Sequence, residues 1–297
     1  MTRTELPPDS LPDLPAPAKA HWQASLQLGF SNDQGTTRLT ERLHSGPLRV
    51  QKPLYPEGGQ TCHAIIIHPP GGVVGGDILD IRARAGEGSH ALITTPGAAK
   101  WYRSNGYTSQ QRVQLEVADG AKLEWLPQET IFFDDARVDL HQSIHLARDA
   151  RYIGGDILCF GRTASGETYR SGKIMQHSEI RREGRLIWFE QGSLAGGTSS
   201  MGSPLALAGK TVCATVIASG NSLDAATLSL LREQTHQLVQ DSEQGALTGA
   251  SQLKSLVVAR YLGNSSEVAK HWMTAVWRHL RPTVIGMAAV APRIWNT

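Results

Sequence analysis

The chain has 297 residues, and its 29 basic and 27 acidic residues leave a formal charge of +2. This length can bury a substantial core without disulfides, and the near-neutral charge gives no compositional support for nucleic acid as a ligand. No stretch approaches the roughly 18 to 20 consecutive apolar residues of a membrane span, so we expect no membrane association.

Glycine is over-represented, whereas aromatic residues are scarce. The 30 glycines make up about a tenth of the chain, against an average near 7%, and this excess favours a fold rich in turns and strands. The three cysteines include no C-x-x-C pair, and the chain does not start with a charged-then-apolar leader. Both features predict a protein of the reducing cytoplasm.

Residues 1–20 contain five prolines and little apolar periodicity. Such a segment cannot continue a helix or a central strand, so we expect a mobile proline-rich tail. The predicted domain therefore covers residues 21–297. It divides into a β body over residues 21–220 and a helix-containing C-terminal part over residues 221–297.

The β body is predicted from short runs with period-two alternation, separated by Gly, Pro, Asn and Asp. A hairpin is expected where residues 178–182 and 185–189 flank Glu183-Gly184, because tight hairpins favour glycine in the turn. The other predicted strands cover residues 48–50, 64–68, 78–85, 90–94, 113–117, 122–126 and 138–146.

Helical periodicity is convincing only near the C-terminus. One helix is predicted over residues 223–241, with Ser222 as its cap, and a second after Asn264, ended by Pro282. Residues 253–262, between the two helices, are predicted as a strand. The expected fold class is therefore mainly β, a large multi-stranded β body with two α-helices near the C-terminus.

Nucleotide-binding and hydrolase motifs are incomplete. The letters GEGSHA at residues 86–91 fit a dinucleotide fingerprint, but a strand is predicted after them where a helix should begin. GKT at residues 209–211 resembles the end of a P-loop, but Pro204 occupies the place of its first glycine. There is no G-x-S-x-G or H-E-x-x-H motif. We therefore assign no catalytic residue.

Two places in the sequence bring metal-ligating residue types close together. His141 and His145 lie in a predicted strand, where four residues span about 13 Å, too far for one ion with metal–nitrogen bonds of about 2.0–2.1 Å. A solvated outer face is the alternative that we favour. Cys62 and His63 are neighbours, but in a strand they point to opposite faces, which favours a buried cysteine over a weak soft-metal contact.

Four blocks carry residues that packing alone does not require. They are HPPGGVVGGD (residues 68–77), TTPGAAKWYR (94–103), LEWLPQETI (123–131) and a glycine–acid series within residues 154–167. Glycines gather beside acids in the first and fourth blocks, which indicates low backbone bulk around a carboxylate. A turn with solvated charges is the plain alternative for each block.

Taken in order, and with the ending PRIWNT from Pro292, these blocks resemble the urease accessory protein family UreD, called UreH in some organisms. The resemblance covers about residue 22 to the C-terminus. It implies a non-catalytic chaperone that binds UreF and, through it, the GTPase UreG. The resulting complex on the urease apoprotein helps to deliver nickel. It also implies strands wound in a helical manner, and no permanently bound cofactor, with nickel only in transit.

Passage of nickel needs a few carboxylates, imidazoles or carbonyls along a wet path, because a closed cage would retain the ion. On the strength of the resemblance, acidic residues that line or shape such a path are predicted, and two basic residues are expected to orient these acids or to meet a partner. The acids are Asp77, Asp156, Glu167 and Glu190, and the basic residues are Lys100 and Arg103.

Partner contact is predicted at the two C-terminal helices and at the C-terminal end, where Arg293 and Trp295 are residue types that anchor interfaces. Trp272 and Trp277 are equally compatible with the core. The alternative function is a phosphate- or nucleotide-binding enzyme that uses the loop 71–77, which would require a helix N-terminus after that loop. A β-rich subunit that contributes architecture alone is a third possibility.

Overall fold

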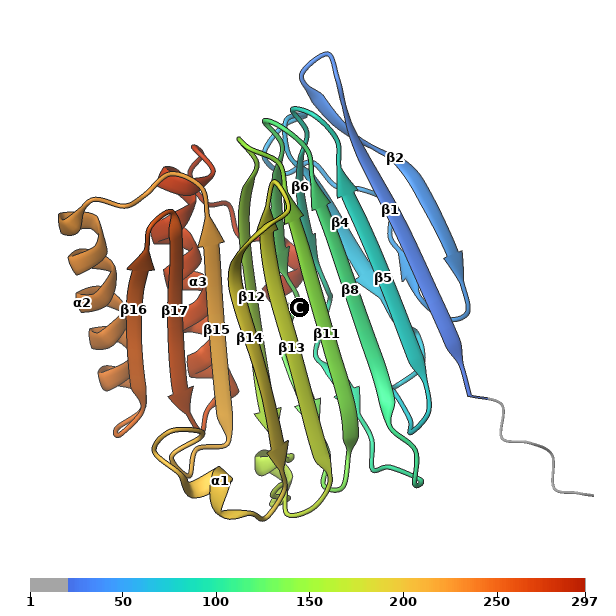
Figure 1. The fold of residues 1–297 in the computed structure, drawn as a ribbon, viewed down its shortest axis with the longest axis vertical. Helices are drawn as coiled ribbons and strands as arrows, with labels where there is room; N and C mark the ends of the chain where they lie inside the picture. Colours follow the sequence, from blue (N-terminus) through green and yellow to red (C-terminus); the bar gives the residue numbers. More distant parts are fainter. Residues whose placement is uncertain (1–20, 297) are drawn as a thin grey trace, which may run out of the picture.

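The computed structural model describes residues 21–296, so the predicted tail at residues 1–20 lies outside the described residues. Two β-sheets form most of the structure (Figure 1). The seven-stranded sheet has the order β14 (Arg185–Ala195), β13 (Lys173–Arg182), β11 (Arg137–Leu146), β8 (Ser109–Val117), β5 (Ile78–Ala85), β1 (Gln23–Asp33) and β2 (Thr36–Ser45).

The ten-stranded sheet faces the seven-stranded one. Its main path runs through β16 (Leu247–Leu253), β17 (Leu256–Gly263), β15 (Val212–Ser219), β12 (Arg151–Phe160), β9 (Lys122–Leu126), β6 (His90–Thr94), β4 (Cys62–Ile67) and β3 (Arg49–Val50). Off this path, β10 (Thr130–Phe132) pairs with β12 and with β7 (Ala99–Trp101).

The chain winds between the two sheets. It passes from β5 to β6, from β8 to β9 and from β11 to β12, and each step changes sheet. Successive strands within one sheet are consequently parallel, as in the series β5, β8, β11 and β13. This helical winding and the predominance of strands confirm the predicted fold class.

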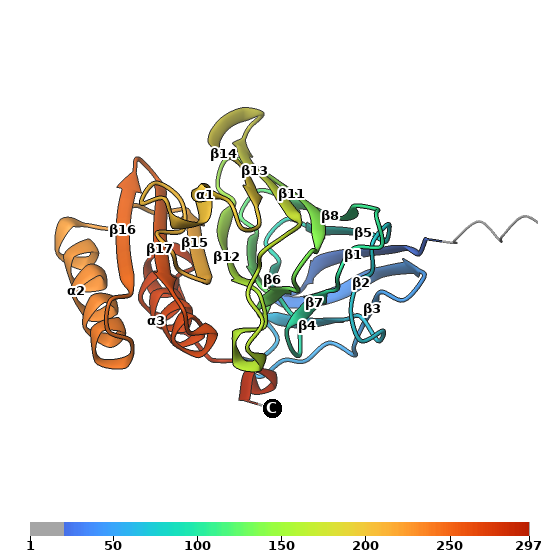
Figure 2. The ribbon, with the colours of Figure 1, turned by 90° about the horizontal axis from the view of Figure 1, so that it is seen from below.

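Two hydrophobic cores hold the layers together. The first lies between the sheets and is built from alternating inward side chains, such as Val113, Leu115 and Val117 of β8. The second lies between the ten-stranded sheet and the helices α2 (Ala225–Ser242) and α3 (Ser266–Val284), which sit at one end of the molecule beside β15, β16 and β17 (Figure 2). Trp272 and Trp277 are fully buried in this second core.

Both predicted helices are present, but their N-caps differ from prediction by one or two residues. Asp224, not Ser222, caps α2, and its carboxylate accepts a 2.7 Å hydrogen bond from the backbone N–H of Thr227. Ser265, not Asn264, caps α3. In each case the side chain nearer the helix reaches an N–H group of the first turn that would otherwise lack a partner.

Pro282 does not end α3, which continues to Val284. A proline lacks only its own N–H, so later residues can still donate to carbonyls one turn back. The backbone N–H of Ile285 donates in this way to the carbonyl of Arg281 at 2.8 Å. The predicted stop is therefore two residues early.

The predicted strand 253–262 is in fact part of a hairpin. β16 and β17 flank a turn in which Lys254 has a φ of 58°, and β16 was missed because its glycine and small polar residues give weak alternation. The other predicted hairpin is confirmed, with φ of 47° at Glu183 and 76° at Gly184. The remaining elements are short: η1 (Thr163–Ser165), α1 (Ser199–Gly202) and η2 (Arg293–Asn296).

Among residues 21–296, no helix has the length and apolarity required to cross a membrane.

Candidate functional site

A row of polar residues crosses the inner face of the ten-stranded sheet. Asp156 of β12 is in register with Thr215 of β15, and Thr215 is in register with Arg260 of β17. The next strand, β16, places Gly249 opposite Arg260. Because directly opposed residues of neighbouring strands point to the same face, this row runs from the interior to the edge of the sheet.

A second row crosses the facing sheet. Glu190 of β14 is in register with Ser178 of β13, which is in register with Gln142 of β11. One internal cavity brings the two rows together, since it is lined by Asp156 and Thr215 from one sheet and by all three residues of this row. Two of the predicted acids, Asp156 and Glu190, therefore lie at the same place although 33 residues separate them in the chain.

This inner cavity is small, and polar and apolar side chains line it together. Its volume of ≈ 20 Å³ is space for about one water molecule or one ion. Asp156 Oδ1 and Ser178 Oγ are buried, and neither has a hydrogen-bond partner among the described residues. Ser178 is only 4% exposed. Buried polar atoms usually have partners, so these two oxygens mark a place where a water molecule or a cation would be stabilised.

The environment of Asp156 favours its protonated form. Burial, and after it the negative charge of Glu190, raise the pKa of Asp156 from 3.8 to about 7, although Arg260 and a hydrogen bond from the Thr215 backbone act in the opposite direction. A cation that enters the cavity would favour the ionised carboxylate, so binding would release a proton.

Arg260 brings a positive charge to these acids. Its Nη2 donates to Oε1 of Glu190, in an ion pair whose side chains are 46% and 31% exposed. An ion pair so open to solvent is held only weakly, because water screens the charges and competes for the hydrogen bond.

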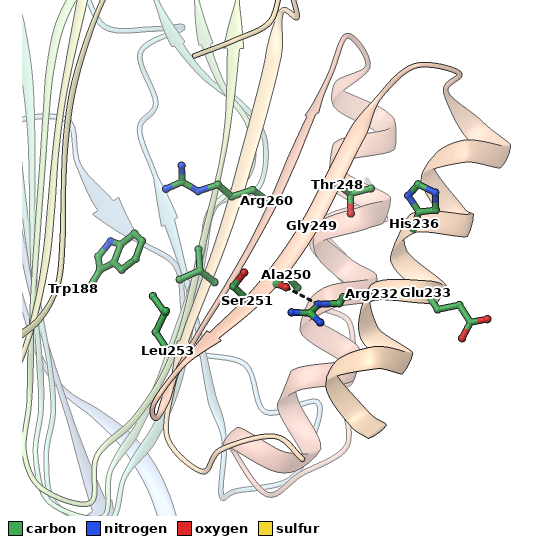
Figure 3. A pocket seen from close by; sticks show the side chains of 11 residues that line it. Trp188, Arg232, Glu233, His236, Thr248, Gly249, Ala250, Ser251, Leu253 and Arg260 are labelled. Atoms are coloured by element: carbon green, nitrogen blue, oxygen red, sulfur yellow. Dashed lines mark hydrogen bonds between the residues drawn. The ribbon is translucent and has the colours of Figure 1, made fainter. Parts of the chain in front are cut away.

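A groove opens on the far side of Arg260. It has a volume of ≈ 840 Å³ and is lined by residues of β14, β16, β17 and α2, including Trp188, Arg232, Gly249 and Arg260. Arg260 extends from β17 toward Trp188, whereas Arg232 of α2 donates to the carbonyl of Ala250 at 2.7 Å (Figure 3). Arg260 thus stands between the groove and the inner cavity.

The two glycines that precede Asp156 leave space for neighbouring side chains. A Cβ at Gly154 would come within 1.9 Å of the Tyr152 hydroxyl, and one at Gly155 within 3.0 Å of Met273 Sδ on α3. The low bulk predicted around the carboxylate therefore makes room for Tyr152 and for α3. Burial, followed by the charge of Asp156, raises the pKa of Tyr152, so its hydroxyl stays protonated.

Asp77 lies elsewhere, at the end of the glycine-rich loop. Its two carboxylate oxygens accept backbone hydrogen bonds from Trp22 and Val74, both at 3.1 Å. The loop itself is bonded to the second sequence block, since the N–H of Val73 donates to the carbonyl of Lys100 at 2.8 Å. β5 follows directly, so the loop lacks the helix N-terminus that the nucleotide-binding alternative requires.

Glu167 also has local partners. It accepts a 3.0 Å hydrogen bond from the backbone of Asp134 and forms a 2.7 Å ion pair with Arg162. The hydrogen bond from Arg162, which outweighs burial, lowers the pKa of Glu167. The contacts of Asp77 and Glu167 are thus those of residues that hold loops.

The predicted basic and aromatic residues are scattered. Lys100 and Arg293 are exposed, and Arg103 lies 3.9 Å from Asp134, not beside a predicted acid. Trp295 is not the exposed ring that an interface anchor requires, because it is only 6% exposed. Its position depends on packing against distant parts of the chain, which the sequence around it does not reveal.

His141 and His145 are exposed, as predicted for an outer face. His141 stacks on His177 of the neighbouring strand, with 5.3 Å between ring centroids. Cys62 is buried, and His63 donates to Glu57. Within residues 21–296, no group of three or more His, Cys, Asp or Glu side chains could hold a metal ion.

Sequence reasoning missed Arg260, Ser178 and Gln142. Only strand register brings them to Asp156 and Glu190, and the sequence does not state which strands are neighbours. The one available signal was a polar residue within an apolar strand, such as Arg260 within LVVARYLG.

The chain was compared with known proteins. The family model described as "UreD urease accessory protein" matches residues 23–296. A protein of Janthinobacterium sp. (strain Marseille) named "Urease accessory protein UreD" is 61% identical over 93% of this chain and 92% of its own length. A protein of the same name from Nitrosospira multiformis is 53% identical over 95% of this chain and 99% of its own length.

Proposed function

Because the chain belongs to the UreD family of urease accessory proteins, we propose that it acts in urease maturation as a non-catalytic chaperone, both scaffold and nickel conduit. The observation that carries the conduit proposal is the meeting of Asp156 and Glu190 at one inner cavity, beside the hydroxyl of Ser178, which has no hydrogen-bond partner among residues 21–296. Nickel is the cargo of this protein and not a resident cofactor.

The chemistry of the inner cavity suits transient binding. Carboxylate and hydroxyl oxygens can each take one position around a divalent cation, and water can fill the others. Two carboxylates hold an ion far less firmly than a closed set of thiolates and imidazoles, so the ion can leave again. Asp77 and Glu167 are assigned in this proposal to the loops that shape the path.

The partners in the proposal are UreF, the GTPase UreG bound through UreF, and the urease apoprotein, in the cytoplasm. The family assignment supports these partners. A chain without a nucleotide site of its own would leave the GTP-dependent step to UreG. The exposed side chain of Arg293 is the contact that we propose for a partner protein.

The test is co-expression with apo-urease, UreF and UreG. Asp156→Asn and Glu190→Gln should leave the accessory complex intact but lower the nickel content of the purified urease. Asp33→Asn, at an exposed acid on β1, is the matched control and should not change it. Wild-type nickel content with both inner-cavity variants would contradict the conduit, and loss of the complex would show a structural role instead.

A further inference from the structure

Arg260 is placed to control access to the carboxylate pair. It lines the groove and forms an ion pair with Glu190. In the ten-stranded sheet it lies two strands away from Asp156, with Thr215 in register between them. We propose that Arg260 is the resident counter-cation of this site, and that an incoming divalent cation must displace its guanidinium from Glu190. This inference rests on the proposed function, because it takes the inner cavity as the place where the metal binds.

The resident cation needs a permanent positive charge for this role. Two carboxylates that share a cavity repel each other, and a positive charge beside them relieves that repulsion. An arginine keeps its charge at every physiological pH, whereas a histidine would lose it. A divalent cation brings twice the charge of the guanidinium, so it can replace Arg260, whereas a monovalent ion offers no gain in charge.

The structure leaves room for the exchange. Arg260 faces Gly249 on β16, where an added Cβ would find no atom within 4 Å. The guanidinium can therefore swing into the groove. Arg232 is held by the carbonyl of Ala250, so within the described groove it does not already occupy the place next to Glu190.

The donor atoms inside the cavity are in place before the exchange. Ser178 Oγ is buried and has no partner among residues 21–296, and the same holds for Asp156 Oδ1. Glu190 already lines the cavity, and when Arg260 leaves, its carboxylate is free to join these two oxygens as a ligand. Release of the guanidinium thus completes the site.

Equilibrium binding of Ni²⁺ alone to the full chain, at one pH and one salt concentration, tests the inference. Arg260→Gln removes the competing charge, so we expect Ni²⁺ binding about tenfold tighter than in the wild type, within the usual range for coupled binding events. Circular dichroism has to show that each variant is folded, because a misfolded chain would expose histidine and cysteine side chains that also bind Ni²⁺. Arg260→Lys keeps the charge and should stay close to the wild type.

Two further variants separate the possible failures. Arg232→Gln removes a positive charge from the same groove without touching Glu190, so it should leave the affinity unchanged; an equal gain there would mean general electrostatics and overturn the inference. Asp156→Asn should weaken binding. If it does so while Arg260→Gln brings no gain, the exchange is refuted and the conduit stands. If Asp156→Asn changes nothing, both proposals fail.

Discussion

Arg281 of α3 and Glu124 of β9 form an ion pair in which both side chains are completely buried, with 3.0 Å between Nη2 and Oε1. The same guanidinium contacts Glu57 with two of its nitrogens. His90 donates to Glu124 at 2.8 Å, and His63 donates to Glu57 at 2.6 Å. One cation thus fastens α3 to the ten-stranded sheet and to the loop before β4.

Removal of Arg281 should therefore be strongly destabilising. Arg281→Ala would leave two buried carboxylates without their cation, and we expect the free energy of unfolding to fall by about 3–5 kcal/mol. Arg278→Ala is the control, because Arg278 lies on the same helix but is exposed, and its effect should stay within about 0.5 kcal/mol. Urea unfolding followed by circular dichroism measures both. Equal effects would mean that the buried pair does not hold α3.

The same network predicts a loss of stability in acid. Burial alone would raise the pKa of Glu57, but hydrogen bonds from His63 and Arg281 lower it from 4.5 to about 2. A carboxyl with a lowered pKa stabilises the folded state above its unfolded pKa and loses that contribution as the pH falls through the folded value. The stability advantage of the wild type over Glu57→Gln should therefore be complete at pH 6 and shrink between about pH 4.5 and 2. Thermal melts of both proteins across this pH range measure the difference. The prediction is wrong if the melting temperatures of the wild type and of Glu57→Gln differ by the same amount at every pH.

Asp156 should show the opposite dependence. Its pKa is raised by burial and by Glu190 to about 7, so between about pH 4 and 7 the folded state holds a proton that the unfolded state has lost. Stability relative to Asp156→Asn should therefore decrease as the pH rises through this range and level off above about pH 7. Chemical unfolding of both proteins at pH 5 and pH 8 measures the difference. If the stability difference between the wild type and the variant were the same at pH 5 and pH 8, Asp156 would be ionised throughout this range and the prediction would be wrong.

These cases show what the sequence could and could not predict. The sequence pattern predicted β5, β6 and β9 at their observed bounds. β5 has one buried face and alternates, whereas β6 and β9 are buried almost throughout and are short runs bounded by turn residues. Asp156 stood out through its glycine neighbours. Arg260 did not, since its role depends on register with two other strands. The burial of Trp295 was not predicted for the same reason, because it depends on residues that are distant in the sequence.

Gly154, at the start of the fourth block, has a close neighbour that some other strand glycines lack. Gly154→Ala would place a methyl group where the Tyr152 hydroxyl lies, and overpacking of this kind costs about 1–3 kcal/mol. Gly192→Ala is the control, because Gly192 lies within β14 with no atom within 4 Å of an added Cβ. We expect a lower melting temperature for the first variant and an unchanged or slightly higher one for the second. Equal melting temperatures would show that Tyr152 moves aside freely.

Substitutions of Trp295 and Arg293 distinguish a role in packing from a role in partner binding near the C-terminus. The Trp295 ring packs edge-to-face on Trp277 with centroids 5.4 Å apart, and its Nε1 donates to Thr94 Oγ1 at 2.8 Å. Trp295→Ala should therefore lower the free energy of unfolding by about 3–5 kcal/mol, as for other buried tryptophans. Arg293 is exposed, so Arg293→Ala should keep the stability within about 0.5 kcal/mol while it weakens co-purification with UreF. Undiminished co-purification of the stable Arg293 variant would move the partner surface away from this end of the chain.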